Sequence, residues 1–292
     1  MAEALVVPTD PVEYPTSDGR PVAETDLHYL RLAGAAYGIR KLLAKRDDVY
    51  VGSNLLVYDE PGNPRRHLAP DIFVAFGVRS GPRDLYKIWE EQPPAFVLEI
   101  TSKTTRREDM RTKRGRYAEW GVREYFLYDP REEWLDPALQ GFELQGGRYR
   151  SMRECVVPNG ERGLPSEALG IYLWLRGGEL RLFDPTAARD LPTPEEEGAE
   201  RDAEAAARKA AEARAAAAES RAVAAEASAL VRQRTLLVHL AERRFDSATA
   251  AALAVLLEPV DAWGNLAAVG ELVVSSDGSA ELLAQVRAVV RR

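Results

Sequence analysis

Residues 95–130 read AFVLEITSKTTRREDMRTKRGRYAEWGVREYFLYDP and predict the central unit of the fold. Both ends of this segment are short apolar runs rich in strand-forming residues. Between them, Asp109, Lys113 and Tyr117 follow the four-residue spacing of one helix face, and Gly121 suits the end of that helix. Strand, helix and strand at this length predict a right-handed βαβ unit with parallel strands.

This unit has an uneven distribution of charge. Glu99 lies near the end of an apolar strand, where an acid is costly unless it is paired or binds a metal. From Lys103 to Arg123, eight basic residues stand against three acids, although the whole chain has a net charge of −7. The basic run is either a solvated helix face or a cationic surface for phosphates beside the carboxylate.

A second acid stands at the edge of the preceding strand. Pro70-Asp71 opens the apolar run DIFVAFG, so Asp71 and Glu99 occupy the edges of successive predicted strands. Two carboxylates from adjacent strands can hold a hard divalent cation through oxygen ligands. Such a cation polarises a phosphodiester and lowers the pKa of a bound water molecule.

Four segments together resemble a known nuclease family. They are PDIFV at 70–74, FVLEITS at 96–102, the spacing T-x3-D-x3-K-x3-Y at 105–117, and GVREYFLYDP at 121–130. Their combination resembles the restriction endonuclease family called the Uma-two type, within the PD-(D/E)XK nuclease superfamily, over roughly residues 24–193. The resemblance implies an α/β fold of the PD-(D/E)XK class, with a mixed central sheet flanked by helices, and metal-dependent DNA cleavage.

The resemblance also implies a role for each acid and for a lysine. Asp71 and Glu99 would ligate Mg²⁺ or Mn²⁺ together with the carbonyl of Ile100. In the usual superfamily pattern a lysine follows the strand acid by two residues, but here Thr101 occupies that position. The resemblance places the catalytic lysine at Lys113, in the helix.

Several further residues have two interpretations. Lys103 keeps the strand period from Glu99 and competes with Lys113 for the catalytic role. Glu24, at the start of the first helix, is either a further ligand or base, or a partner of the helix dipole. His28 is either catalytic or a satisfied polar group at a helix start. The predicted supporting residues are Thr101, Ser102, Asp109, Tyr117 and His28, and the predicted DNA-contacting residues are Lys103, Arg106, Arg107, Arg111, Arg114 and Arg116.

Composition limits the other classes of function. A single cysteine, Cys155, and three scattered histidines allow neither an internal disulfide nor a zinc cluster. We expect a cytoplasmic protein that does not enter a membrane, because the sequence has neither a signal-like start nor an apolar run of membrane-spanning length. The acidic balance argues against unselective nucleic-acid binding by the whole surface, but it allows a local basic groove.

Shifts in composition divide the chain into four parts. We predict an N-terminal arm over 1–20, a nuclease-like domain over 21–194, an Ala/Glu/Arg-rich helix over 195–232 and a C-terminal helical module over 233–292. Glycine pairs at 146–147 and 177–178 predict two hairpins that flank the central sheet. Between residues 199 and 229, seventeen of thirty-one residues are alanine, which favours one long exposed helix. This helix is either a solvated spacer or a coiled coil.

Two functions from different classes remain in competition. The first is a Mg²⁺-dependent endonuclease that binds DNA and forms a homo-oligomer, most simply a dimer, through the nuclease domain or the helical tail. The second is a catalytically inactive nucleic-acid-binding or assembly protein that keeps the nuclease fold. The lysine's separation from the strand acid favours the second, whereas Lys113 directed at a cation between Asp71 and Glu99 would favour the first.

Overall fold

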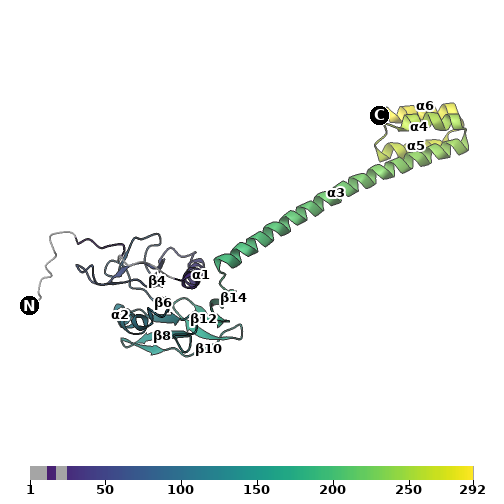
Figure 1. Ribbon diagram of the computed structural model, residues 1–292. Helices are drawn as coiled ribbons and strands as arrows, with labels where there is room; N and C mark the ends of the chain where they lie inside the picture. The colour runs from purple at the N-terminus through teal and green to yellow at the C-terminus, as the bar shows by residue number, and fades with distance from the viewer. Residues whose placement is uncertain (1–11, 18–24, 292) are drawn as a thin grey trace, which may run out of the picture. The chain divides into compact units, whose positions relative to one another are not determined.

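The computed structural model describes residues 12–17 and 25–291 and divides the chain into two compact units, Met1–Glu200 and Arg201–Arg292. The elements of the first unit (Figure 1) are α1 (Asp26–Leu42), β1 (Val49–Ser53), β2 (Val57–Tyr58), β3 (His67–Leu68), β4 (Ile72–Phe76), β5 (Tyr86–Lys87), β6 (Phe96–Ile100), the π-helical segment η1 (Glu108–Lys113), α2 (Arg114–Trp120), β7 (Glu124–Tyr128), β8 (Leu139–Gln145), β9 (Arg148–Ser151), β10 (Cys155–Val156), β11 (Arg162–Ser166), β12 (Ile171–Arg176), β13 (Glu179–Asp184) and β14 (Arg189–Asp190). The helix α3 (Pro194–Arg244) begins in the first unit and continues into the second, which also contains α4 (Ser247–Leu257), α5 (Trp263–Ser275) and α6 (Ser279–Val290).

A mixed sheet forms the centre of the first unit, with the strand order β1-β4-β6-β7-β8-β9. β6 and β7 run parallel, and every other neighbouring pair in this sheet is antiparallel. The helical segment η1–α2 connects β6 to β7, as expected for the predicted βαβ unit. The predicted fold class, a mixed central sheet with helices followed by a long helix and a small helical bundle, is confirmed.

The two faces of this sheet are covered by different helices. α1 buries Leu32 and Ile39 in the core on one face, and α2 buries Tyr117 and Trp120 in the core on the other. Successive side chains of a strand point to opposite faces. Because Val97 of β6 belongs to the core on the α2 side, the side chain two residues later, that of Glu99, points to the same side.

Two glycine pairs form the predicted hairpin turns. Gly146 and Gly147 join β8 to β9 with φ of 56° and 77°, and Gly177 and Gly178 join β12 to β13 with φ of 56° and 81°. Positive φ at both turn positions is a conformation that glycine adopts without a steric cost. The first hairpin extends the central sheet instead of flanking it, because β8 pairs with β7. The second belongs to a separate five-stranded sheet, β10-β11-β12-β13-β14.

A small sheet, β3-β2-β5, adds to the core on the α2 side. The described part of the N-terminal arm packs on it. The rings of Tyr14 and Tyr58 meet edge to face with 5.0 Å between their centres, and Tyr58 OH donates to Pro15 O at 2.6 Å. The arm predicted over residues 1–20 is therefore attached to the first unit at residues 14–15, and residues 1–11 and 18–24 lie outside the described chain.

In the second unit, the C-terminal part of α3 packs with α4, α5 and α6 (Figure 1). The fully buried side chains of this core include Ala241, Leu253, Leu266, Val269, Leu282 and Val286. Residues 201–228 of α3 are exposed, and the predicted coiled-coil dimer through this helix stays a prediction. Within residues 12–17 and 25–291, no helix combines the length and the apolar character needed to cross a bilayer.

The first turn of α3 belongs to the first unit. Glu196 Oε2 accepts hydrogen bonds from Arg181 NH2 and Thr193 N, both at 2.9 Å. Glu197 Oε2 accepts one from Lys41 Nζ at 2.5 Å. The structure accordingly divides the chain after Glu200, whereas composition suggested a boundary between residues 194 and 195.

This difference can be tested by truncation. We expect a protein that ends at residue 200 to fold, and one that ends at residue 194 to lose about 1–3 kcal/mol of unfolding free energy. The reason is that Arg181, only 6% exposed, no longer pairs with Glu196 in the shorter protein. Urea unfolding of the two proteins, followed by circular dichroism, measures the difference. Equal stability of the two, or an unfolded protein ending at residue 200, would contradict the expectation.

Candidate functional site

Asp71 and Glu99 face each other across two antiparallel strands. β4 and β6 pair Ile72 with Leu98, so the same register continued by one residue sets Asp71 opposite Glu99. Directly opposite residues lie on the same face of a sheet, with Cβ atoms about 4.5–5.5 Å apart. Asp71 is 8% exposed and Glu99 is 0% exposed. The structure thus brings the two predicted metal ligands together in a buried place.

The helical segment after β6 brings a lysine and a tyrosine to Glu99. Lys113 Nζ donates to Glu99 Oε2 at 2.8 Å, and Tyr117 OH donates to Glu99 Oε1 at 2.5 Å. Lys113 Nζ also lies 3.1 Å from Asp109 Oδ1. The spacing of Asp109, Lys113 and Tyr117 therefore gathers all three near Glu99. The local helix type differs from the prediction, because residues 108–113 form a π-helical segment, a feature that often occurs at functional sites.

The main chain after Glu99 is directed at Asp71. Ile100 N donates to Asp71 Oδ2 at 2.6 Å, and Thr101 N donates to Tyr128 O on β7 at 2.7 Å. The C=O and N–H groups of one trans peptide unit point in opposite directions. Because the Thr101 N–H points to β7, the Ile100 carbonyl points to the β4 side, where Asp71 lies. The carbonyl that was predicted as a ligand is therefore on the same side as the acid.

Three other predicted residues border this group. His28, near the start of α1, has its Nε2 3.7 Å from Asp71 Oδ1. Thr101 is 2% exposed, and its Oγ1 has no hydrogen-bond partner in the described part of the chain. Ser102 N donates to a hydroxyl of the loop after β6, that of Thr105, at 3.1 Å. The predicted Glu24 lies outside the described residues.

Burial and like charges shift the ionisation of this group. Burial raises the pKa of Glu99 well above its usual range; Lys113 opposes this shift, and Asp71 and Asp109 add to it. Burial also raises the pKa of Asp109, against the opposing effect of Lys113 and Thr105. Burial alone would lower the pKa of Lys113, but the neighbouring carboxylates outweigh it and raise that pKa above its usual value. One ammonium thus faces three carboxylates, Asp71, Glu99 and Asp109.

The donor set fits a hard divalent cation. Carboxylate and carbonyl oxygens are the ligands that Mg²⁺ and Mn²⁺ prefer. Asp71 and Glu99 offer carboxylates from opposite positions on β4 and β6, and the Ile100 carbonyl points to the β4 side. A double positive charge would offset the excess of negative charge. The buried hydroxyl of Thr101, without a partner among the described residues, is the kind of group that a polar ligand satisfies. Within the described ranges, no three His, Cys, Asp or Glu side chains are grouped to hold a metal ion, so the donors would be two acids and a carbonyl.

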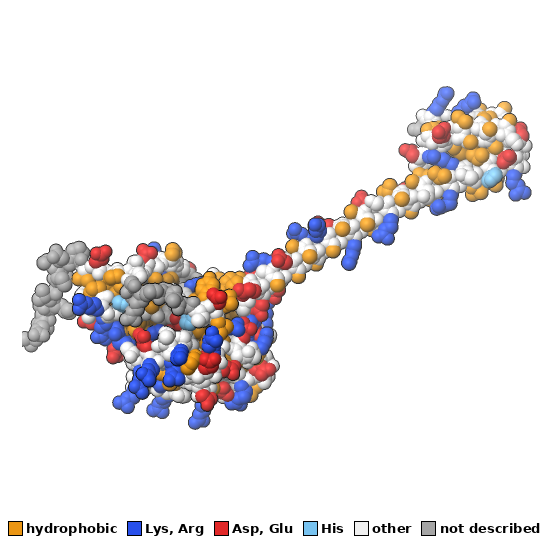
Figure 2. Space-filling model, in the orientation of Figure 1, with side chains coloured by type: hydrophobic (Ala, Val, Ile, Leu, Met, Phe, Trp, Pro, Cys, Tyr) orange, Lys and Arg blue, Asp and Glu red, His pale blue; other side chains and the backbone are white. Residues whose placement is uncertain are grey.

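Three of the six predicted DNA-contacting cations are exposed, namely Lys103, Arg107 and Arg111. The other three, Arg106, Arg114 and Arg116, are partly exposed. Figure 2 shows Lys and Arg side chains gathered on the first unit around α2 and β8. Lys103, the alternative to Lys113, has its Nζ 6.0 Å from the centre of the Trp134 ring. The structure therefore brings Lys113, and not Lys103, within hydrogen-bonding distance of Glu99.

Arg114 and Arg116 have partners inside the protein. The guanidinium of Arg114 lies 4.1 Å from the centre of the Phe142 ring. Arg116 donates through Nε and NH2 to Asp59 Oδ2 at 2.9 and 2.6 Å, and Trp120 Nε1 donates to the same oxygen at 2.6 Å. The sequence interpretation missed Asp59, because an acid in a turn gives no signal of a partner that is distant in the sequence. Arg116 thus ties α2 to the turn after β2.

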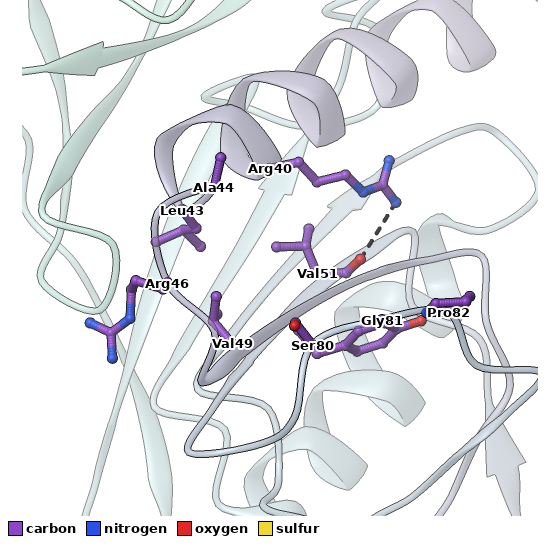
Figure 3. A pocket seen from close by; sticks show the side chains of 10 residues that line it. Arg40, Leu43, Ala44, Arg46, Val49, Val51, Ser80, Gly81 and Pro82 are labelled. Carbon is purple, nitrogen blue, oxygen red and sulfur yellow. Dashed lines mark hydrogen bonds between the residues drawn. The ribbon is translucent and has the colours of Figure 1, made fainter.

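A cavity of about 440 Å³ lies between the end of α1 and β1 (Figure 3). Arg40 on its wall donates through NH2 to Val51 O at 3.5 Å. Asp71 lies beyond the other end of β1, since Ser53 at that end pairs with Ile72. Among the described residues that line the cavity, none is an acid. The cavity is therefore separate from the carboxylate site.

Comparison with known proteins concerns mainly the first unit. The model of the Uma2 family, described as "Putative restriction endonuclease", matches residues 7–176, which is more than half of the 292-residue chain. No curated protein matches the chain. One similar solved structure is described as a putative nuclease belonging to DUF820 from Anabaena variabilis. It has 13% sequence identity and a TM-score of 0.37, and the match covers 50% of this chain and 75% of that chain.

Proposed function

Because this chain belongs to the Uma2 family, we propose that it is an endonuclease that hydrolyses phosphodiester bonds in DNA with the help of Mg²⁺ or Mn²⁺. The observation that supports this most directly is the convergence of Asp71, Glu99 and Lys113 at one buried place. Two acids from neighbouring strands can hold a divalent cation for phosphodiester hydrolysis, and a nearby ammonium can stabilise charge on the phosphate.

Asp71, Glu99 and the Ile100 carbonyl would hold the cation. When bound, the cation supplies polarisation of the phosphodiester and a more acidic water molecule. The protein orients its own ligands before any cation arrives. The Ile100 N–H fixes one oxygen of Asp71, and Lys113 and Tyr117 each fix one oxygen of Glu99.

Lys113 supplies the positive charge that Thr101 cannot provide. Its ammonium stays protonated at neutral pH, because the surrounding carboxylates raise its pKa. A preorganised positive charge next to a phosphate stabilises the negative charge that develops on the phosphate oxygens in the transition state. Lys113 therefore takes the role that the strand lysine has in the usual superfamily pattern.

The exposed cations on and before η1 are proposed to contact DNA phosphates. We expect the double replacement of Arg107 and Arg111 by Gln to weaken DNA binding. The logarithm of the DNA association constant falls as the logarithm of the salt concentration rises. The magnitude of this slope should decrease by about 1 for each arginine–phosphate pair that the replacement removes. Fluorescence anisotropy with a labelled duplex over a range of salt concentrations measures this slope. An unchanged slope would contradict the assignment of these arginines.

Arg116 provides the matched control for that measurement. Replacing Arg116 by Gln should leave the salt slope unchanged, because this side chain is committed to Asp59. It should instead lower the unfolding free energy by about 1–3 kcal/mol, since a carboxylate that is 3% exposed loses a charged partner.

A second candidate function is nucleic-acid binding without cleavage. One observation favours it, namely that Glu99 is 0% exposed and both of its carboxylate oxygens already accept hydrogen bonds. The test is an assay on supercoiled plasmid and single-stranded DNA, with and without Mg²⁺ or Mn²⁺, using purified wild type and the Asp71→Asn variant. Metal-dependent nicking that the variant lacks supports the endonuclease. DNA binding with no cleavage in either metal supports the second candidate.

A further inference from the structure

Lys113 already neutralises the carboxylate that the proposed cation needs. Its Nζ lies 2.8 Å from Glu99 Oε2 and 3.1 Å from Asp109 Oδ1. Glu99 and Asp109 are 0% and 1% exposed, and Lys113 is 8% exposed. In this arrangement the ammonium is shared between two buried acids, of which only Glu99 is a proposed metal ligand.

A divalent cation and this ammonium compete for Glu99. Mg²⁺ binds oxygen ligands at about 2.0–2.1 Å, so a cation on Glu99 would lie only a few ångströms from an ammonium on the same carboxylate. Two positive charges this close repel each other strongly in a buried site, where water screens little. A cation on Glu99 therefore weakens the attraction between Glu99 and Lys113, and a buried ammonium needs another negative partner.

We propose that Asp109 is a positioning residue that receives Lys113 when a divalent cation takes Glu99. This inference rests on the proposed metal site. Asp109 stands one helical turn before Lys113 and already lies within ion-pairing distance of its ammonium. A small movement of the long, flexible lysine side chain is enough to transfer the ammonium fully to Asp109.

The backbone around Asp109 is fixed, so the lysine is the part that moves. Asp109 N donates to Thr105 O at 2.9 Å, and Tyr125 OH donates to Asp109 O at 2.9 Å. Tyr125 is 0% exposed and belongs to the core on the α2 side. Asp109 is thus held by the sheet through Tyr125, and it keeps Lys113 near the site without ligating the cation itself.

The test measures binding of Mn²⁺ to the full chain by calorimetry in a double-mutant cycle of Asp109→Asn and Lys113→Met. We expect Asp109→Asn to weaken Mn²⁺ binding by about tenfold, because the ammonium is then left with Glu99 as its partner. Lys113→Met should tighten Mn²⁺ binding, because the competing cation is gone. In the Lys113→Met background, Asp109→Asn should have no weakening effect. Glu108→Gln, an exposed neighbour with the same change of charge, is the control and should bind Mn²⁺ as the wild type does.

Three other results of these binding measurements would overturn the inference. Equal weakening by Asp109→Asn in both backgrounds would make Asp109 a metal ligand. No weakening in the wild-type background would remove its role altogether. A wild type that binds no Mn²⁺ would remove the proposed metal site, and the inference with it, which distinguishes that failure from the other two.

A crystal structure of the wild type with Mn²⁺ decides the question if the Lys113→Met variant does not fold. An ammonium hydrogen-bonded to Asp109 and withdrawn from Glu99 supports the inference. An ammonium that still contacts Glu99 overturns it.

Discussion

Asp71→Asn and Glu99→Gln should each reduce metal-dependent DNA cleavage by about 10²–10³-fold or more, while leaving the fold intact. Both replacements keep the shape of the side chain and remove its charge. The amide oxygen of Asn at position 71 can still accept from Ile100 N, which is 2.6 Å from Asp71 Oδ2. Cleavage rates on supercoiled plasmid measure the loss, and thermal unfolding of the same proteins measures the fold.

Glu124 supplies the matched control for these two variants. It is also a buried acid at a strand end, 4% exposed, and it accepts from Ser166 Oγ at 2.5 Å and from Ala168 N at 2.9 Å. It pairs with Phe96, at the opposite end of β6 from Glu99. Glu124→Gln should therefore cleave at the wild-type rate. Full activity in Asp71→Asn and Glu99→Gln, in protein free of host nucleases, would refute the proposed endonuclease.

The central fold was predictable because its signals are local. The apolar runs around Glu99 and Tyr125, with a helix pattern between them, are enough to predict a βαβ unit, and the structure has β6 and β7 parallel. Register explains why the two acids meet. Asp71 precedes its strand by one residue and Glu99 is next to last in its own, so antiparallel pairing sets them opposite each other.

The partners of the charged side chains were not predictable in the same way. The basic sequence around Arg116 suggested a contact with DNA and gave no sign of its ion pair with Asp59, an acid fifty-seven positions away in the sequence. The π-helical form of residues 108–113 also has no clear sequence signal. Tertiary contacts decide both features, and periodicity reports only which face a residue occupies.

The boundary between the two units also depends on tertiary contacts that composition does not show. Alanine content marks the long helix correctly but does not show that its first turn belongs to the preceding unit. Glu196 and Glu197 look like ordinary acids at a helix start, where they also favour the positive end of the helix dipole. Only the structure shows that they bind Arg181 and Lys41.

Lys113→Met should reduce cleavage by about 10²–10³-fold and, without metal, lower the unfolding free energy by about 3–5 kcal/mol. Glu99 and Asp109 would lose their shared positive partner in a buried place, so their raised pKa values should rise further. An acid whose pKa is higher in the folded than in the unfolded state binds more protons when folded, so stability should rise as the pH falls toward that raised pKa. Urea unfolding between pH 5 and 8, with and without Mn²⁺, measures the loss of unfolding free energy and its pH dependence. Mn²⁺ at about 100 times its Kd should restore about 2.7 kcal/mol of unfolding free energy.

Lys103→Met separates the two lysines that the sequence left in competition. Lys103 is exposed, with its Nζ near the Trp134 ring, whereas Lys113 lies 2.8 Å from Glu99. Loss of Lys103 should therefore leave stability and the pH dependence of unfolding unchanged, and should weaken DNA binding only in a salt-dependent way, as expected for a phosphate contact. If Lys103→Met is inactive and Lys113→Met cleaves normally, the catalytic ammonium comes from the end of the strand. In that case the contact between Lys113 and Glu99 serves only to neutralise a buried acid.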